Sequence, residues 1–472
     1  MIIGRTQEIK TLRTAYNSKR SEFIVVYGRR RVGKTYLIKE VFDGCFTFTH
    51  TGIAKAAKTT QLKGFQASLK KVGYKCSKPR TWFDAFLVLE EWIENLPDGR
   101  KVIFLDELPW MDTPRSNFVS ALEHFWNAWA SARKDIVLIV CGSATSWIVN
   151  KIINNHGGLH NRLTHRIHLQ PFCLNECEQM SENMELNLSR YQLLQAYMIF
   201  GGVPYYWSLL DRELSLSQNI DRLFFNPDGE MANEFEMLYA SLFDKPESYI
   251  KVIETLTNRK SGLTREELVE QSGLCSNGTL TRIIKELEWC GFIRTYNRIG
   301  QKKKDAIIQL IDLYSLFYYQ VFTESAGDEQ YWSHHLLSGK LNSWMGRAFE
   351  RVCLWHVPQI KNAMGIDGIA SNVYSWYVKG TGKTKGAQID LLLERADHII
   401  SLCEMKFSED DYSITSTEEE NLRRRRTRFI EETGTKDSVQ YVLVTTYGLV
   451  QGKHSYIVQR TITMNELFLA HK

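Results

Sequence analysis

Apolar and polar residues follow two different periods along the first 170 residues of the chain. Continuous runs of β-branched and aromatic residues predict buried strands at 23–27, 101–105, 135–141 and 167–172. Apolar residues at helical spacing predict helices at 36–42 and 117–132, and Trp126 and Trp129 of the second helix are expected in the core. Strands that alternate with helices predict an α/β domain built on a parallel sheet.

A second pattern begins near residue 245, where three short amphipathic stretches precede two strand-like runs. Helices are predicted at 249–258, 264–273 and 277–290, and strands at 291–296 and 306–310, on either side of the basic tip Lys302–Lys304. A capping box at Thr264–Glu267 opens the second helix. This order predicts a winged helix-turn-helix domain at 245–320.

Two roles of that middle domain fit its sequence equally well. Its third helix would enter a DNA major groove while lysines contact phosphates. Alternatively, the domain would pack against the N-terminal half of the chain and transmit its state. The second role fits as well as the first, because Arg282 and Lys285 are the only basic residues on the exposed side of the third helix.

The last third of the chain returns to strand-like runs. They are predicted at 373–377, 388–393, 398–406 and 440–445. A helix containing Gly346–Arg351 precedes them, and a basic helix at 418–432 carries Arg423–Arg426 and Arg428. Helix, three strands, helix and strand predict a second α/β domain at 335–472.

The composition indicates the class of protein but not the reaction that it carries out. The chain has 472 residues, 43% hydrophobic and 24% charged, which predicts several packed domains. Its net charge of +5 is small, so any nucleic-acid surface is expected to be local. Nine cysteines without a C-x-x-C pair predict reduced thiols. No signal peptide or membrane-spanning run is evident, and a cytoplasmic protein without a membrane partner is expected.

A complete G-x-x-x-x-G-K-T motif follows the first predicted strand and opens the first helix. Its residues are expected to bind a nucleotide, together with Tyr36 beyond them: Gly28, Arg29, Arg30, Arg31, Val32, Gly33, Lys34 and Thr35. The glycines let backbone amides converge on phosphate oxygens, and the helix N-terminus adds partial positive charge. Lys34 would reach the β- and γ-phosphates, and the Thr35 hydroxyl would ligate Mg²⁺. The motif predicts binding of ATP or GTP.

Acidic and polar residues at the ends of later strands would complete this nucleotide site. Asp106 would hold Mg²⁺, and Glu107 would orient or deprotonate the attacking water, which favours hydrolysis over binding alone. Ser143 would sense the γ-phosphate, although a turn or helix cap explains it nearly as well. Arg162 would stabilise charge on the γ-phosphate in cis or from a neighbouring subunit, or it is a solvated surface residue.

Residues 1 to about 230 resemble the archaeal-type ATPases of the STAND class, which are relatives of the AAA+ ATPases. The matching segments are Ile3–Glu8, Gly28–Thr35, Leu105–Glu107, Cys141–Ser143 and Gly201–Tyr205. The resemblance implies that Pro204 lies near the adenine and favours ATP over GTP.

A second group of charged residues lies on the C-terminal strands. Asp390 occupies one strand, and Glu404 and Lys406 share one face of the next, because side chains alternate along a strand. Asp390, Glu404 and the Met405 carbonyl would hold Mg²⁺, with Glu350 completing the shell. Lys406 would orient water for phosphodiester hydrolysis. A surface salt-bridge cluster is an equally good explanation of the trio alone.

The order of elements around this trio resembles the restriction-endonuclease-like PD-(D/E)xK superfamily, although Ile389 stands where a proline is common. The two resemblances together imply an α/β protein in four parts. They are a P-loop NTPase core with a parallel sheet (1–175), a helical lid (176–244), the winged helix-turn-helix domain (245–320) and a restriction-endonuclease-like domain (335–472).

The leading hypothesis is an ATPase that uses ATP and Mg²⁺ to control a metal-dependent nuclease acting on nucleic acid, DNA before RNA. Defence or mobile-element biology would suit that design by fold-level analogy. The alternative is a nucleotide-gated switch that binds DNA or a regulatory protein without cutting. A ring-forming motor ranks last, and a homo-oligomer is compatible with each hypothesis. The Arg423 cluster would contact phosphates, or it is a solvated helix face balanced by glutamates.

Overall fold

The computed structural model describes residues 2–155, 157–159, 161–243, 245–297, 299, 306–380 and 385–470. The chain divides into two compact units, Met1–Pro171 and Phe172–Lys472. In the described residues, no helix is both long enough and apolar enough to cross a membrane.

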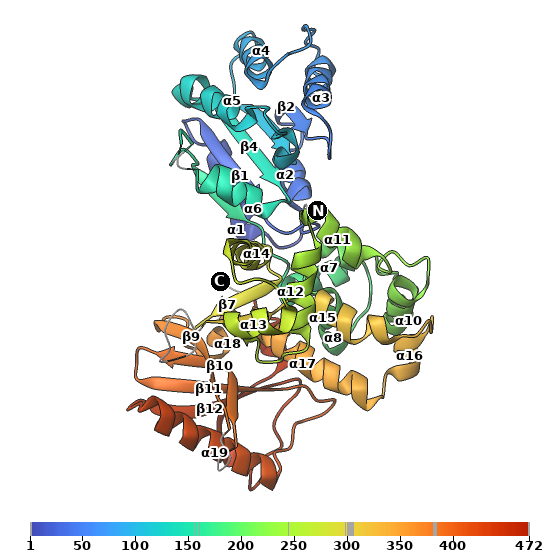
Figure 1. Cartoon of the computed structure of the whole chain (residues 1–472), viewed down its shortest axis with the longest axis vertical. Helices are drawn as coiled ribbons and strands as arrows, with labels where there is room; N and C mark the ends of the chain where they lie inside the picture. The colour runs from blue at the N-terminus through green and yellow to red at the C-terminus, as the bar shows by residue number, and fades with distance from the viewer. Residues whose placement is uncertain are drawn as a thin grey trace. The chain divides into compact units, whose positions relative to one another are not determined.

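The first unit is built on a five-stranded, fully parallel sheet (Figure 1). The strand order is β2 (Phe46–Thr51), β3 (Lys101–Asp106), β4 (Ile136–Gly142), β1 (Glu22–Tyr27) and β5 (His165–His168). The predicted parallel α/β architecture is therefore confirmed. The predicted strand at 167–172 is wrong in its extent, because β5 ends at His168 and the Phe172 amide instead donates to the Gly202 carbonyl at 2.6 Å.

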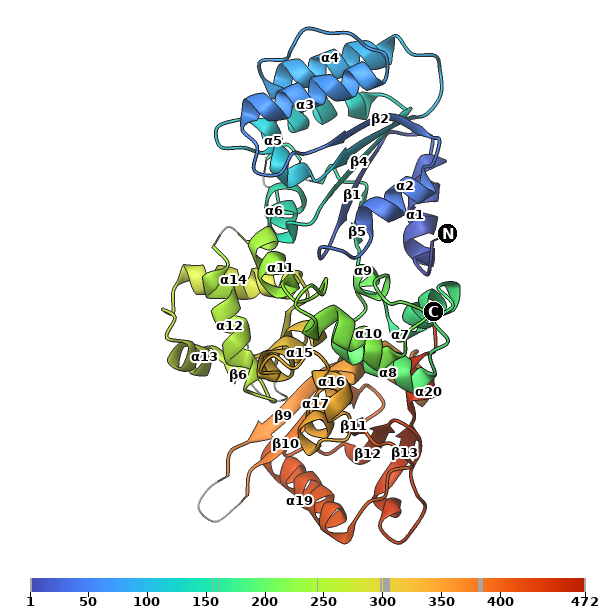
Figure 2. The same ribbon diagram turned by 90° about the vertical axis from the view of Figure 1, so that its right-hand side faces the viewer.

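Both faces of this sheet are covered by helices, as the apolar runs predicted. One face packs against α1 (Thr6–Tyr16) and α2 (Lys34–Val41), whose buried residues join those of β1, β3 and β4. The other face packs against α3 (Lys58–Lys71), α4 (Trp82–Glu94) and α5 (Phe118–His124). Helices α3 and α4 lie side by side (Figure 2).

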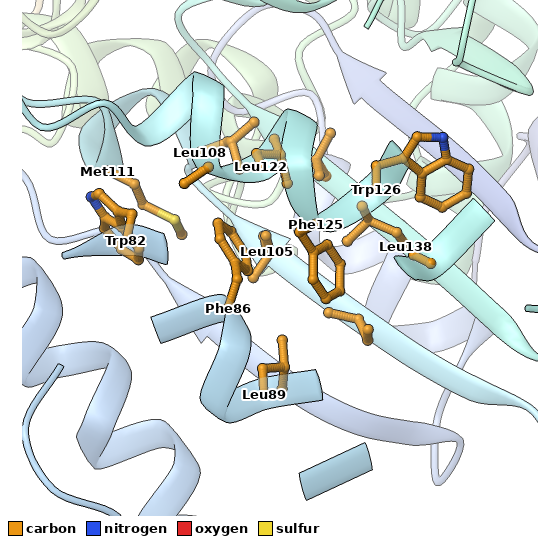
Figure 3. Close-up of a cluster of buried hydrophobic side chains, with 14 of the residues drawn as sticks. Trp82, Phe86, Leu89, Leu105, Leu108, Met111, Leu122, Phe125, Trp126 and Leu138 are labelled. Atoms are coloured by element: carbon orange, nitrogen blue, oxygen red, sulfur yellow. The ribbon is translucent and has the colours of Figure 1, made fainter. Parts of the chain in front are cut away.

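An aromatic cluster fills the space between the second face and its helices (Figure 3). Trp82 and Phe86 of α4 contact Phe118, with the Trp82 and Phe118 rings 4.9 Å apart. Trp126 is 3% exposed, which confirms its predicted place in the core, whereas Trp129 is only partly buried. The single helix predicted at 117–132 is broken, because α5 passes into a π-helical turn at Phe125–Trp129 and a short 3-10 turn at Ala130–Ala132.

The second unit begins with a group of helices. They are α7 (Leu174–Asn183), α8 (Arg190–Phe200), α9 (Pro204–Trp207), α10 (Leu216–Ile220) and α11 (Glu234–Leu242). The later helices α15 (Leu313–Gln320) and α16 (Tyr331–His335) pack against this group. At their junction the ring of Phe224 lies 4.8 Å from that of Phe317.

Three helices and a small sheet occupy residues 247–310. They are α12 (Glu247–Thr257), α13 (Arg265–Ser272) and α14 (Gly278–Trp289), with the antiparallel sheet β6 (Leu263–Thr264), β8 (Ile307–Leu310) and β7 (Ile293–Tyr296). The capping box predicted at Thr264–Glu267 is formed. The predicted basic tip Lys302–Lys304 lies outside the described residues. Of the nine free cysteines of the chain, Cys275, between α13 and α14, is the one that is exposed.

A second five-stranded sheet occupies the C-terminal part. Its order is β13 (Val458–Ile462), β12 (Ser438–Thr445), β11 (Ile399–Lys406), β10 (Ala387–Arg395) and β9 (Ser371–Val378). Strands β9, β10 and β11 are antiparallel, whereas β11, β12 and β13 are parallel. Helix α19 (Ser416–Thr433) connects β11 to β12 and packs on the sheet (Figure 2). Helix α17 (Gly339–Trp355) contacts β11, and α18 (Val357–Met364) and α20 (Met464–Leu467) lie near β13.

Candidate functional site: a phosphate loop and an acidic cluster

The predicted phosphate loop lies between β1 and α2 and depends on two glycines. Gly28 has φ +144°, and a Cβ atom on it would lie 2.3 Å from the Leu169 carbonyl oxygen. Gly33 has φ +91° and precedes the first residue of α2. Side chains at these positions would strain the backbone or push it away from β5. The loop therefore keeps its backbone amides close to the N-terminus of α2, where an anion is favoured.

Lys34 is folded back over this loop. Its ammonium group donates hydrogen bonds to the Gly28 carbonyl at 3.0 Å and the Arg29 carbonyl at 2.9 Å, and the residue is buried. The long side chain thus lies along the loop that is predicted to hold phosphates.

Asp106, at the end of β3, collects several hydrogen-bond donors. The Thr35 hydroxyl donates to its two oxygens at 3.0 and 3.2 Å, and the Glu107 amide donates at 3.0 Å. The Cys141 thiol donates at 2.7 Å, and burial followed by the Asp106 charge raises the pKa of this thiol well above its ordinary value. A hydroxyl and a carboxylate side by side are the hard oxygen ligands that Mg²⁺ prefers, so the donor set fits that ion.

Glu107 adopts a left-handed backbone conformation, with φ 48°. Its carboxylate accepts hydrogen bonds from the Ser143 hydroxyl at 3.1 and 3.3 Å and from the Ser143 amide at 3.4 Å. The structure therefore brings together two residues that the sequence assigned separate tasks. A strained conformation of a non-glycine residue persists only when its surroundings hold it, and here Ser143, directly after β4, supplies hydrogen bonds that restrain it.

Arg5 is a residue of this site whose role the sequence analysis missed. It is buried, with φ 58°, directly before α1, and its guanidinium donates to the Val32 carbonyl at 3.3 Å. The available signal was the Ile3–Glu8 segment, which resembles the archaeal ATPases but carries no chemistry in sequence alone. Arg5 and Lys34 therefore bind different carbonyls of the same loop.

The remaining residues that were predicted to contact the nucleotide lie in the loop, on α2, before β5 and on α9. Arg30 and Arg31 are half-buried in the loop, and Tyr36 is 51% exposed on α2. Arg162 lies in an exposed turn before β5. Pro204 begins α9 in the second unit. The expected roles of these residues remain predictions.

The predicted acidic cluster lies at one end of the β10–β11 hairpin. Asp390 and Glu404 are the next residues on each strand after the paired residues Leu391 and Cys403. Lys406 lies beside Glu404, with 3.3 Å between its Nζ atom and Oε1, which confirms that the two side chains point together. The Met405 side chain is buried on β11, as expected.

Cations from two other elements reach these carboxylates, and the sequence analysis anticipated neither contact. Arg425 of α19 forms a bidentate pair with Glu404 at 2.9 and 3.1 Å. Lys260 lies between α12 and β6, and its Nζ atom is 2.5 Å from Glu350 Oε1 and 3.8 Å from Asp390 Oδ2. The three carboxylates that were predicted to hold a metal therefore each lie within 4 Å of a cation.

Within this cluster the pKa of Glu350 is raised, whereas the pKa of Glu404 is lowered. Burial and the nearby Asp390 charge raise the pKa of Glu350 to about 7, although Lys260 acts against the shift. Burial also acts to raise the pKa of Glu404, but Arg425 and Lys406 outweigh it and hold the pKa below its ordinary value. Glu404 is therefore ionised at neutral pH, whereas Glu350 gains a proton readily.

Arginines of the basic helix α19 pair either with the cluster or with glutamates of the helix itself. Arg425 contacts Glu404, whereas Arg423 and Arg428 pair with Glu419 and Glu432 one turn away on α19. A pocket of about 330 Å³ lies between this helix and the sheet, beside Glu404 and Lys406. Among the described residues, no three His, Cys, Asp or Glu side chains are arranged to hold a metal ion. The cluster as it stands is closed by its own cations.

Comparison with known proteins identifies the first part of the chain. Residues 2–210 match the model of an ATPase domain predominantly from Archaea. An uncharacterized protein of Methanocaldococcus jannaschii is 24% identical over 364 residues, which are 75% of this chain and 76% of that protein. An uncharacterized ATP-binding protein of the same organism is 42% identical over 43 residues, 9% of this chain and 73% of that protein.

A solved structure supports the same assignment at the level of the fold. The Walker-type ATPase of Pyrococcus abyssi has a TM-score of 0.51 and 14% identity, and the match covers 68% of this chain and 96% of that chain. The parallel sheet, the phosphate loop and the family match agree with one another. The chain therefore contains an archaeal-type ATPase domain with the α/β P-loop fold.

Proposed function

We propose that this chain hydrolyses ATP and uses the nucleotide state to control a Mg²⁺-dependent nuclease site that acts on DNA. The observation that carries the proposal is the convergence of Asp390, Glu404 and Lys406 at one end of the β10–β11 hairpin, in a chain that also holds a phosphate loop. Each site has the donor chemistry that phosphate and a divalent ion require.

In the nucleotide site, Lys34 would leave its two carbonyl partners and bind the β- and γ-phosphates of ATP. Thr35 and Asp106 would hold Mg²⁺, which supplies charge neutralisation between the phosphates. Glu107 would orient or deprotonate the attacking water while Ser143 fixes its carboxylate, with 3.1 Å between the hydroxyl and Oε2. Arg162 would stabilise charge on the γ-phosphate, and Pro204 would contact the adenine.

In the acidic cluster, Asp390, Glu404 and the Met405 carbonyl would hold Mg²⁺, and Glu350 would contribute a further oxygen. The chemistry that the ion supplies there is polarisation of a phosphoryl oxygen. Lys406 would orient the attacking water. The order α17, β9, β10, β11, α19 and β12 resembles that of the PD-(D/E)xK nucleases, which supports phosphodiester hydrolysis as the reaction.

Nucleic acid is the substrate that best fits the remaining surfaces. The order of elements in residues 247–310 supports a winged helix-turn-helix domain, in which α14 would be the recognition helix. Arg424 on α19, which lines the pocket beside Glu404, would contact backbone phosphates there. Defence against foreign DNA or mobile-element biology would suit an ATP-controlled nuclease.

The alternative is a nucleotide-gated switch that binds DNA or a protein partner without cutting. It is favoured by one observation, namely that Lys260 and Arg425 neutralise the carboxylates that a metal would need. A buried carboxylate paired with a cation is also an ordinary way to hold two elements together.

A cleavage assay separates these functions. Plasmid, linear and single-stranded DNA are incubated with Mg²⁺ or Mn²⁺, with and without ATP, and products are resolved on a gel. We expect cutting that Asp390→Asn reduces by roughly a hundredfold or more. Asp397→Asn is the matched control, because Asp397 is an exposed carboxylate beyond the same strand, paired with Arg395. Cutting that both variants retain would contradict the nuclease proposal, and a shift in DNA mobility without cutting would favour the switch.

A further inference from the structure

The turn between α12 and β6 carries a lysine into the acidic cluster. Lys260 lies in this turn, 90 residues before its partner on α17 in the sequence, and its ammonium group contacts Glu350 Oε1 at 2.5 Å and approaches Asp390 Oδ2 at 3.8 Å. Burial acts to lower the pKa of Lys260, but Glu350, Asp390 and Glu404 together raise it, so the ammonium group stays charged. A single cation therefore balances carboxylates from two separate elements.

The turn is anchored from both sides by buried polar side chains. The Lys260 carbonyl accepts a hydrogen bond from the Arg351 guanidinium at 2.7 Å and another from the Gln309 amide at 2.8 Å. Arg351 is 4% exposed and Gln309 is fully buried. Gly262 has φ +73°, and a Cβ atom on it would lie 2.5 Å from the Ile308 carbonyl oxygen. The backbone at Lys260 is thus held in place, while its side chain is half-exposed.

Lys260 contacts one carboxylate oxygen of Glu350 and leaves the other without a donor in the part of the chain that the structure describes, which indicates room for a further ligand. Glu350 is 7% exposed. Its Oε1 atom is paired with Lys260, but its Oε2 atom is buried without a hydrogen-bond partner among the described residues. A buried carboxylate oxygen without a donor costs free energy. A divalent ion between Glu350 and Asp390 would satisfy oxygens that one ammonium group leaves open.

We propose that Lys260 is an internal counter-ion of the acidic cluster, which occupies the position between Glu350 and Asp390 that a divalent cation would take. This inference rests on the metal-binding role proposed for the cluster. The ammonium group and the metal then compete for the same carboxylates, so the docked turn lowers the metal affinity. Release of the turn from α17 and β8 raises the metal affinity. The middle segment, residues 247–310, would control the nuclease site through this one side chain.

The test is a titration of the full-length protein with Mn²⁺, without nucleotide, followed by the electron paramagnetic resonance signal of free Mn²⁺. Binding to the cluster is the part of the signal that Asp390→Asn removes. Lys260→Met, which keeps the length of the side chain and removes its charge, is expected to bind Mn²⁺ at least about tenfold more tightly than the wild type. The matched control is Lys251→Met, since Lys251 is an exposed lysine on α12 that pairs with Glu254 at 3.0 Å.

Thermal unfolding gives a second readout that does not depend on cleavage. Mn²⁺ is expected to raise the Tm of Lys260→Met more than that of the wild type or Lys251→Met, because tighter binding stabilises the folded state more. Lys260→Arg keeps the charge and is expected to bind Mn²⁺ close to the wild-type affinity.

Three results would overturn the inference in different ways. Equal Mn²⁺ affinity in Lys260→Met and the wild type would overturn the competition while leaving the metal site intact. Weaker binding in Lys260→Met would show that the lysine supports the site instead of opposing it. Absence of Mn²⁺ binding in both would overturn the competition and the proposed nuclease function together.

Discussion

The hydrogen bonds of the phosphate loop join charged groups to neutral partners, whereas the acidic cluster joins charged groups to opposite charges. Lys34 donates to two backbone carbonyls, and Asp106 accepts from a hydroxyl, a thiol and an amide. In the cluster, Glu350 and Glu404 instead hold Lys260 and Arg425.

This difference determines which interactions each site loses when it binds a ligand. A hydrogen bond between a charged group and a neutral partner contributes about 1.5–3 kcal/mol net, and new hydrogen bonds from the Lys34 ammonium group to phosphate would replace those that the loop loses. Breaking a fully buried ion pair costs roughly 3–5 kcal/mol when one charge is left without a partner, and the cost is lower for the Lys260–Glu350 pair because the Lys260 side chain is half-exposed. The first site is therefore arranged to accept a ligand directly, while the second needs a metal or a movement to displace its cations.

The largest expected effect is on the rate of ATP hydrolysis. Glu107→Gln keeps the shape of the side chain and one oxygen that can accept from Ser143, but removes its basicity, so kcat should fall by about 10³-fold, within the range of general-base catalysis. ATP affinity, measured by calorimetry, should stay close to the wild-type value. Glu123→Gln, elsewhere in the same unit, serves as the control. An unchanged kcat in Glu107→Gln would assign the base to another residue.

Loss of Lys34 tests whether the loop exchanges its partners for phosphate. Lys34→Ala removes the ammonium group and should weaken ATP binding by about a hundredfold, or roughly 2.7 kcal/mol. Mn²⁺ binding to the acidic cluster should be the same as in the wild type. If Lys34→Ala lost both ATP binding and Mn²⁺ binding and also had a lower Tm, the substitution would have damaged the fold and not only the nucleotide site.

Each unit also contains a buried histidine whose titration should lower stability in mild acid. Burial lowers the pKa of His50 in the first unit and of His356 in the second to about 4. The unfolded chain, with a histidine pKa near 6.5, binds protons between about pH 6.5 and 4 that the folded chain does not. The free energy of unfolding therefore falls as the pH drops through this window, by about 2 kcal/mol per histidine at pH 5.

Urea denaturation at pH 7.5 and pH 5 measures this effect. His356→Gln should show a smaller loss between the two pH values than the wild type, although its stability at pH 7.5 falls because the Leu174 amide loses the ring nitrogen that accepts its hydrogen bond at 3.0 Å. His398→Gln is the control, since His398 is 87% exposed. Equal pH dependence in all three proteins would contradict the assignment.

The smallest effect is expected at Ser143. Ser143→Ala removes the hydroxyl that donates to Glu107 but leaves the backbone amide contact at 3.4 Å. The rate of ATP hydrolysis should fall about fivefold, equivalent to roughly 1 kcal/mol, with little change in ATP affinity. A fall as large as that of Glu107→Gln would indicate that Ser143 also contacts the γ-phosphate.

The central strands of the first unit could be predicted from sequence because both of their faces are buried. Strands β1, β3 and β4 are continuous apolar runs of this kind. The edge strands β2 and β13 were missed, since Phe46–Thr51 alternates with threonine and histidine and Val458–Ile462 includes Gln459 and Arg460. An edge strand is half-exposed, and its composition resembles that of a loop.

The candidate sites divide along a similar line. The phosphate loop is contiguous in sequence, so its residue types and spacing are visible before any fold is known. Lys260 and Arg425 come from separate elements, and their partners lie elsewhere in the chain. No local pattern marks a lysine in a tight turn as the counter-ion of a glutamate on a distant helix. The roles of Arg162 and Pro204 and the boundaries inside the second unit remain predictions.

The accessibility of Cys275 has a practical consequence for watching the middle segment move. The other eight cysteines are buried or half-buried, and burial raises the pKa of the Cys353 and Cys403 thiols, which makes them slow to react. A maleimide dye should therefore attach to the native chain first at Cys275, between α13 and α14. Fluorescence from that single label would follow displacement of the segment in real time, with every residue of the chain left as it is.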